Sequence, residues 1–74
     1  MTPFWGYCRN PVDDSWTPSV RLDTAEACYH YCLLHHGWAP EILICDEEDF
    51  IVLFVENHVL KCPMPDGTLG ETRL

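Results

Sequence analysis

The sequence predicts an α+β domain of two layers, in which one helix packs on three antiparallel strands, or on four if an N-terminal strand joins them. Two observations lead to this prediction. Residues 23–37 have the periodicity and the end signals of an amphipathic helix. Three short apolar runs, separated by polar turns, then follow between residues 41 and 62. The expected order of elements is therefore (β)αβββ.

The helix is predicted over residues 25–36. Asp23 or Thr24 can serve as the N-cap, and with Asp23 in that role Glu26 falls at the third helical position, as in a capping box. Gly37 is expected to end the helix in the left-handed conformation. The stripe expected to face the sheet consists of Ala25, Cys28, Tyr29, Cys32, Leu33 and His36.

Three strands are predicted after the helix, over Glu41 to Cys45, Phe50 to Val55 and His58 to Cys62. The second run has no polar break, which indicates a strand at the centre of the sheet or one that is covered on both faces. Four consecutive acids, Asp46 to Asp49, form the first turn. A two-residue connection of hairpin length separates the last two strands.

The other segments are predicted to be irregular. Residues 1–21 form an arm, in which Phe4 to Arg9 is a candidate strand because aromatic side chains suit a pleated surface. Residues 63–74 contain proline and glycine and are expected to be a flexible C-terminal tail. A chain of 74 residues leaves room for one core, so a single domain is expected over residues 1–62, with the helix and the three strands in residues 22–62.

Twelve acidic residues against four Lys and Arg give a net charge of −8. This charge repels nucleic-acid phosphates and anionic membrane surfaces, so neither is expected as a partner. No apolar run approaches the roughly 20 residues that cross a bilayer. Residues 1–6 lack the basic and long apolar regions of a secretory signal. Solubility alone accounts for such a charge in most acidic small proteins, and recognition of a basic protein partner is the alternative interpretation.

The chain has five cysteines, Cys8, Cys28, Cys32, Cys45 and Cys62. The odd number leaves at least one thiol without a partner in the chain. Mostly free thiols in the cytoplasm are expected, because no secretory signal is predicted. Free cysteines usually act as small apolar residues of a core. No cofactor is expected in this interpretation.

A zinc site is the alternative interpretation of the same residues. Cys28, Cys32 and His36 are spaced i, i+4, i+8 along one side of the predicted helix. Cys45 or Cys62 ends a strand that could meet them, and Cys62 completes the candidate set. Three or four such ligands can hold a tetrahedral zinc. The paired C-x-x-C spacing typical of zinc knuckles does not occur, so core thiols are favoured.

For catalysis, the order of Cys28, His58 and Asp66 resembles that of transglutaminase-like cysteine hydrolases. Those enzymes place a cysteine at a helix start, a histidine on a following strand and an acid beyond it. The resemblance implies Cys28 as nucleophile and His58 as base, and it covers only these isolated residues. Cys28 is expected one turn inside the helix, where the helix N-terminus does not lower the pKa of a thiol. A thiol hydrolase is therefore the remote alternative.

The function favoured by the sequence is a non-enzymatic protein-interaction module, an adaptor or an inhibitor. The small size, the acidic charge, the many aromatic residues and the absence of a catalytic motif all favour it. A homodimer is expected if the aromatic residues of the arm leave the sheet partly uncovered. Tryptophan is enriched in binding hot spots. The candidate partner contacts are Asp46, Glu47, Glu48 and Asp49 of the acidic turn, together with Trp5 and Trp16.

Overall fold

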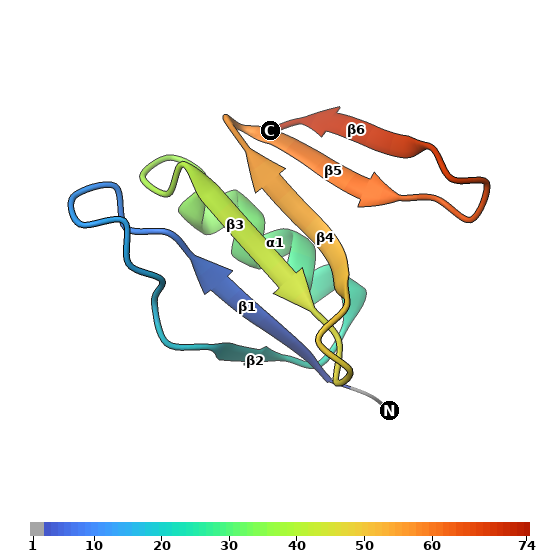
Figure 1. Cartoon of the computed structure of the whole chain (residues 1–74), viewed down its shortest axis with the longest axis horizontal. Coiled ribbons are helices and arrows are strands. Elements are labelled where there is room, and N and C mark those ends of the chain that lie inside the picture. The colour runs from blue at the N-terminus through green and yellow to red at the C-terminus, as the bar shows by residue number, and fades with distance from the viewer. Residues whose placement is uncertain (1–2) are drawn as a thin grey trace.

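A computed structural model describes residues 3–74 of the chain. The elements are β1 (Phe4–Cys8), β2 (Val20–Leu22), α1 (Ala25–His35), β3 (Glu41–Cys45), β4 (Ile51–Glu56), β5 (Val59–Pro63) and β6 (Leu69–Arg73). The six strands form one antiparallel sheet in the order β2–β1–β3–β4–β5–β6, and α1 lies across one face of it (Figure 1). The predicted α+β class, with one helix on an antiparallel sheet, is confirmed. The predicted number of strands is wrong, because the sheet has six.

The two unpredicted strands, β2 and β6, are the edges of the sheet. β2 has three residues, and β6 has the largely polar sequence Leu-Gly-Glu-Thr-Arg. Val-Arg-Leu of β2 alternates over three residues only, which is too short to predict a strand, and β6 has no apolar alternation. Residues 69–73, expected to belong to a flexible tail, instead pair with β5 along their whole length. Residues 1 and 2 of the predicted arm lie outside the described residues.

The predicted strands are confirmed with small shifts at their ends. β1 lies within the candidate strand of the arm, and β3 has the predicted bounds. β4 and β5 each begin one residue later than predicted. For β5 the cause is the preceding turn, where Asn57 and His58 have positive φ angles of 52° and 67°. Two successive residues in this conformation form a tight hairpin turn, so His58 belongs to the turn.

The ends of α1 follow from local hydrogen bonds. Thr24 is the N-cap, and its Oγ1 accepts a hydrogen bond from the amide of Ala27 at 3.0 Å. His36 is the C-cap and keeps a helical φ of −63°. The left-handed conformation predicted for Gly37 is wrong, because its φ is not positive. The chain instead leaves the helix in a turn whose amides donate to the carbonyl of His35.

The buried face of α1 is rotated relative to the prediction. Its buried residues are Cys28, Tyr31 and Cys32. Tyr29 and Leu33, which were expected to face the sheet, are 44% and 39% exposed. The helix therefore turns Tyr31 toward the sheet and leaves one apolar flank partly uncovered.

The Tyr31 side chain fixes this rotation. A Cβ atom on Gly6 of β1 would lie 2.8 Å from Cε2 of Tyr31, so the glycine leaves the space that the ring fills. The thiol of Cys8, also in β1, donates a hydrogen bond to the Tyr31 hydroxyl at 3.1 Å. The helix consequently makes its main contacts with β1, β2 and β3. β5 and β6 lie clear of the helix in Figure 1.

The core lies between α1 and the central strands. Ile42 and Ile44 of β3 and Val55 of β4 are its most deeply buried large aliphatic side chains. Within residues 3–74, no helix has the length and the apolar character needed to span a membrane.

A β-bulge explains the uninterrupted apolar run of β4. Cys45 pairs with Ile51 and Ile44 pairs with Leu53, so Val52 is the extra residue. A bulge lets two successive residues lie on the same face of a strand, and Val52 and Leu53 both line a hollow on the helix side of the sheet. β4 has a neighbouring strand on each side, in agreement with its predicted interior position.

Candidate protein-binding surface

A hollow of about 280 Å³ lies beside α1 on the helix side of the sheet. The helix forms one wall, β4 and β5 form most of the floor, and Phe4 of β1 and Ile44 of β3 complete the lining. The wall consists of Ala25, Cys28 and Tyr29, and the floor of Val52, Leu53, Leu60 and Cys62. We call this hollow the helix-side groove. It exists because α1 is held mainly over β1 to β3 and covers the next strands only in part: Val55 and Leu60 are buried, whereas Val52, Leu53 and Cys62 are partly exposed.

The lining of the helix-side groove is suited to apolar side chains. Its only polar side-chain groups are the Tyr29 hydroxyl and the thiols of Cys28 and Cys62. Small-molecule sites usually have volumes of about 300–1,000 Å³ and a few polar groups that orient the ligand. The groove is slightly smaller than that range and nearly lacks such groups. Its chemistry therefore fits the apolar side chains of a protein segment better than a polar small molecule.

The acidic turn is the β3–β4 loop, which lies at the same end of the sheet as the start of α1 (Figure 1). Its four carboxylates have different roles. Asp46 Oδ1 accepts hydrogen bonds from the amides of Glu48 and Phe50, at 2.9 and 3.0 Å. Asp49 has a positive φ of 64°, as the loop requires. Asp46 and Asp49 thus shape the loop, while Glu47 and Glu48 present exposed charges.

All four Lys and Arg side chains lie on the face of the sheet away from α1. The strand register and the alternation of side chains place Arg21, Lys61 and Arg73 on that face. Arg9 follows β1 and forms an ion pair with Glu41 on the same face, at 2.9 Å. These are all the basic residues of the chain apart from its histidines. The acidic groups near the groove therefore have no Lys or Arg to neutralise them on the helix side.

The second apolar surface is the face of the sheet opposite the helix, which we call the open face. Its partly buried side chains lie next to one another across β1, β3 and β4. The ammonium group of Lys61 lies 5.8 Å from the centre of the Phe54 ring and covers part of it. The open face consists of Trp5, Tyr7, Leu43 and Phe54. The sequence candidate Trp5 thus lies here, one strand away from the base of the acidic loop.

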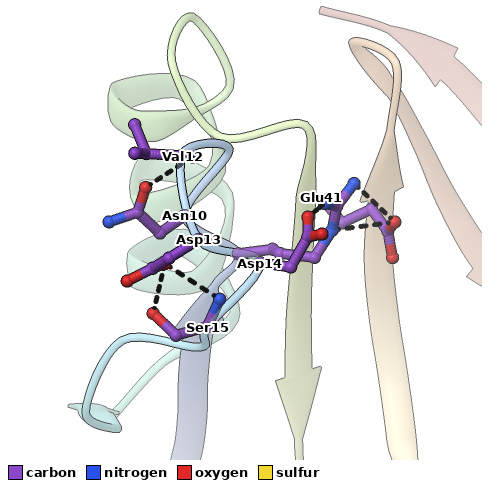
Figure 2. A network of polar contacts seen from close by, with 7 residues as sticks. Asn10, Val12, Asp13, Asp14, Ser15 and Glu41 are labelled. Carbon is purple, nitrogen blue, oxygen red and sulfur yellow. Dashed lines mark hydrogen bonds and ion pairs between the residues drawn. The ribbon is translucent and has the colours of Figure 1, made fainter.

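The sequence candidate Trp16 lies elsewhere, in the loop between β1 and β2. It is 42% exposed and forms an isolated bridge with Arg9, beyond the end of β1. This loop is held by its own polar contacts (Figure 2), in which Asn10 accepts from the amide of Val12 and Asp13 from Ser15. The structure therefore brings Trp5 close to the acidic loop and leaves Trp16 at the other end of β1.

All five cysteines are unpaired, and only Cys62 is not buried. Burial raises the pKa of Cys8 and of Cys28, and this effect is larger than the opposite effect of the hydrogen bond that each thiol makes. Burial, together with the neighbouring thiols, raises the pKa of Cys32 to about 12. Burial, followed by the charges of the acidic loop, also raises the pKa of Cys45. These thiols are protonated at neutral pH and act as apolar core groups.

The four candidate zinc ligands do not converge. His36 follows Cys28 by eight residues, which is about 12 Å along a helix axis. The Nδ1 atom of His36 instead lies 2.9 Å from that of His58. Cys28 and Cys62 both line the groove, whereas Cys32 is fully buried in the core. Residues 3–74 contain no group of three or more Cys, His, Asp or Glu arranged to hold a metal, so zinc binding stays a prediction that needs a rearrangement.

The three residues of the hydrolase comparison lie in separate places. Cys28 is buried in the first part of α1, and His58 lies beside His36 at the other end of the helix. Asp66 lies in the β5–β6 loop, where hydrogen bonds from the hydroxyl and the amide of Thr68 lower its pKa. Cys28 has no histidine beside it in this arrangement, and its burial opposes formation of a thiolate.

Two features were missed by sequence reasoning. The helix-side groove depends on the rotation of α1, which the helical periodicity did not indicate. The pairing of His36 with His58 joins the end of the helix to the β4–β5 turn, and the two rings are nearly perpendicular. One ring donates from Nδ1 and the other accepts, and the tautomers decide which ring has which role.

Comparison of the chain with models of protein families, with curated proteins and with solved structures finds no match. Function must therefore be inferred from the surfaces of the molecule. The most distinctive of these is an apolar groove that adjoins an acidic loop.

Proposed function

We propose that the protein is a non-enzymatic protein-interaction module, an adaptor or an inhibitor, that binds a basic partner through the helix-side groove. The partly exposed apolar surface beside α1 carries this proposal. Tyr29 and Leu33 form the exposed flank of the helix next to the groove, and both are more than a third exposed. Contiguous apolar surfaces of this kind mark interaction sites in small proteins. Each Å² of apolar surface buried there contributes about 25 cal/mol.

The charge distribution supports a basic partner. The first turn of α1, which contains Glu26, and the β3–β4 loop, which contains Glu47 and Glu48, lie at the same end of the sheet. Ala25 at the start of α1 and Val52 near the start of β4 line the groove at this end. The protein's Lys and Arg side chains are all on the opposite face. Complementary charges speed association and exclude partners of the wrong sign. The acidic residues beside the helix-side groove thus favour a partner that has Lys and Arg around its apolar contact residues.

A second copy of the chain is a less favoured occupant. Two copies that met through their groove sides would place two acidic loops and two Glu26 side chains in one interface, to which the helix side contributes no Lys or Arg. Each chain also carries a net charge of −8. Like charges across an interface are destabilising. These charges favour a basic partner over a homodimer.

Thiol chemistry has little support in comparison. The four buried cysteines have raised pKa values, which oppose formation of the nucleophilic thiolate. Cys62 lines the groove, and no histidine is among the residues that line the groove with it. A binding role therefore accounts for the groove better than a hydrolytic one.

Site-specific photo-crosslinking in cells that produce the protein tests this function. The crosslinking amino acid is placed at position 29, in the groove wall, and in a matched control at position 34. Leu34 lies on the opposite flank of α1 and is 75% exposed. A discrete crosslinked partner is expected from position 29 alone, and excess wild-type protein should compete for it whereas the Tyr29→Ala variant should not. Equal crosslinking from both positions, or competition by Tyr29→Ala, would contradict the proposal.

A further inference from the structure

We infer that the segment bound in the helix-side groove is an amphipathic α-helix of about three turns with Lys and Arg on its outer side. This inference rests on the proposed function and specifies the partner. It follows from the width of the groove, from the hydrogen bonding of its floor and from the distribution of charge around it.

The width of the partly covered half of the sheet, β4 to β6, matches one helix. Adjacent strands lie about 4.8 Å apart, so the three strands β4, β5 and β6 extend over about 10 Å. An α-helix with its side chains is about 10–12 Å in diameter. The existing helix α1 is 11 residues long and forms one wall. A second helix of similar length beside α1 would complete the covering layer of this sheet face.

The floor of the groove favours a helix over an extended segment. β4 and β5 are interior strands, each paired on both sides, so their backbone groups are already hydrogen-bonded to neighbouring strands. An extended partner strand would bring its own amide and carbonyl groups into an apolar groove that offers no backbone partners. Each unpaired buried polar group is costly. A helix satisfies its backbone internally and presents only side chains, commonly at positions i, i+4 and i+7.

The charge around the groove specifies the outer side of that helix. Glu26 follows the wall residue Ala25 in the first turn of α1, and the exposed Glu47 and Glu48 belong to the loop that leads into β4, whose Val52 lines the groove. Basic side chains flanking the apolar face of the bound helix would meet these carboxylates. An acidic or neutral helix would bury the same apolar area without that attraction, so it should bind more weakly and with less dependence on salt.

Binding of three synthetic peptides of about 18 residues to the full chain tests the inference, since shorter isolated helices are marginal in water. The first peptide has leucines along one helical face and lysines elsewhere. The second has the same composition with the leucines distributed around the helix. The third keeps the leucine face and replaces each lysine with glutamate. Affinity is measured by fluorescence anisotropy at low and high salt, and the contact surface is mapped by NMR chemical shifts.

The first peptide should bind at least about tenfold more tightly than the other two, gain helicity on binding and perturb Val52, Leu53 and Leu60. Tyr29→Ala should weaken its binding by about tenfold, whereas Leu34→Ala should change it less than twofold. The double variant Glu47→Gln, Glu48→Gln should reduce both the affinity and its salt dependence. Equal affinity for the first two peptides, or shifts confined to Trp5, Tyr7 and Phe54 of the open face, would overturn the inference.

Failure of the helix inference can be distinguished from failure of the proposed function. If no helical peptide binds but position 29 crosslinks a basic partner whose bound segment is extended, the helix assignment is wrong and the interaction function stands. If neither the peptides nor a crosslinked partner contacts the groove, both are wrong.

Discussion

A Cβ atom on Gly6 would lie 2.8 Å from Cε2 of Tyr31, so only a glycine at this position of β1 lets the Tyr31 ring pack where it does. That contact holds α1 over one half of the sheet. The Tyr29 flank of the helix then faces the half of the sheet that α1 covers only in part, and the helix-side groove lies between them. A close approach between the first strand and the helix thus determines where the protein has a surface available for binding.

Replacing Gly6 with alanine is expected to destabilise the fold by about 1–3 kcal/mol, because the added methyl group overpacks against a buried ring. Gly37→Ala is the matched control. A Cβ atom at Gly37 meets nothing within 4 Å, and the φ of Gly37 is not positive, so this change should be neutral or slightly stabilising. Urea unfolding of the two variants measures the difference. Equal stabilities would show that the close contact does not position the helix.

The acidic loop should separate into residues that fold it and residues that only carry charge. Asp46→Ala removes the acceptor of two backbone amides and is expected to cost about 1 kcal/mol of unfolding free energy. Glu47→Gln removes one exposed charge and should change stability by less than about 0.5 kcal/mol. Thermal melting of both variants checks this. A loss of stability in Glu47→Gln as large as that in Asp46→Ala would contradict the roles assigned to the two residues.

The five thiols should react in an order set by burial. Cys62 is the only cysteine that is not buried, so iodoacetamide is expected to modify it first in the native protein. Cys8, Cys28 and Cys32 should react only as the chain unfolds. Peptide mass spectrometry over a time course gives the five rates. A Cys28 that reacts faster than Cys62 would support the thiol hydrolase instead.

Stability should fall at alkaline pH. Burial raises the pKa of Cys32 from its ordinary value of 9.0 to about 12, and raises the pKa of Cys8 and Cys28 in the same direction. The thiol pKa values are higher in the folded state than in the unfolded state. The contribution of the protonated thiols to the free energy of unfolding is therefore complete below about pH 9. It is lost as the pH rises toward the folded values, by up to about 1.4 kcal/mol per pH unit for each thiol.

Thermal melting between pH 8 and pH 11 measures this loss. The melting temperature of the wild type should decline above pH 9, and that of Cys32→Ala should start lower but decline less steeply. Identical slopes for the two proteins would show that Cys32 does not carry the pH dependence.

The helix and the three strands that follow it were predictable because their signals are local. Thr24 can cap a helix wherever it precedes one, and the run from Glu41 to Cys45 is a short apolar segment between a proline and a polar turn, which is a local strand signal. The edge strands were not predictable on this basis. β6 is a strand because it pairs with β5, and its own residues show little preference for that conformation.

The candidate site depended on contacts that no local pattern reports. Tyr31 and Gly6 are 25 positions apart in sequence, and their fit decides which flank of the helix stays exposed. The acidic loop was predictable as a charged hairpin tip, whereas the role of Asp46 in folding it required the geometry. Trp5 and Trp16 were grouped by residue type, and the fold separates them to the two ends of β1.

The measurement that tests the helix-side groove most directly is the alkylation rate of Cys62 with and without the leucine–lysine peptide. Cys62 lies in the groove floor, and its neighbour Lys61 projects to the open face, so the double variant Lys61→Cys, Cys62→Ala places a control thiol on the other side of the same strand. At saturating peptide, the alkylation of Cys62 should slow by about tenfold or more, while the thiol at position 61 should react at an unchanged rate. Equal protection of both thiols, or protection of position 61 alone, would contradict the assignment of the groove as the binding surface.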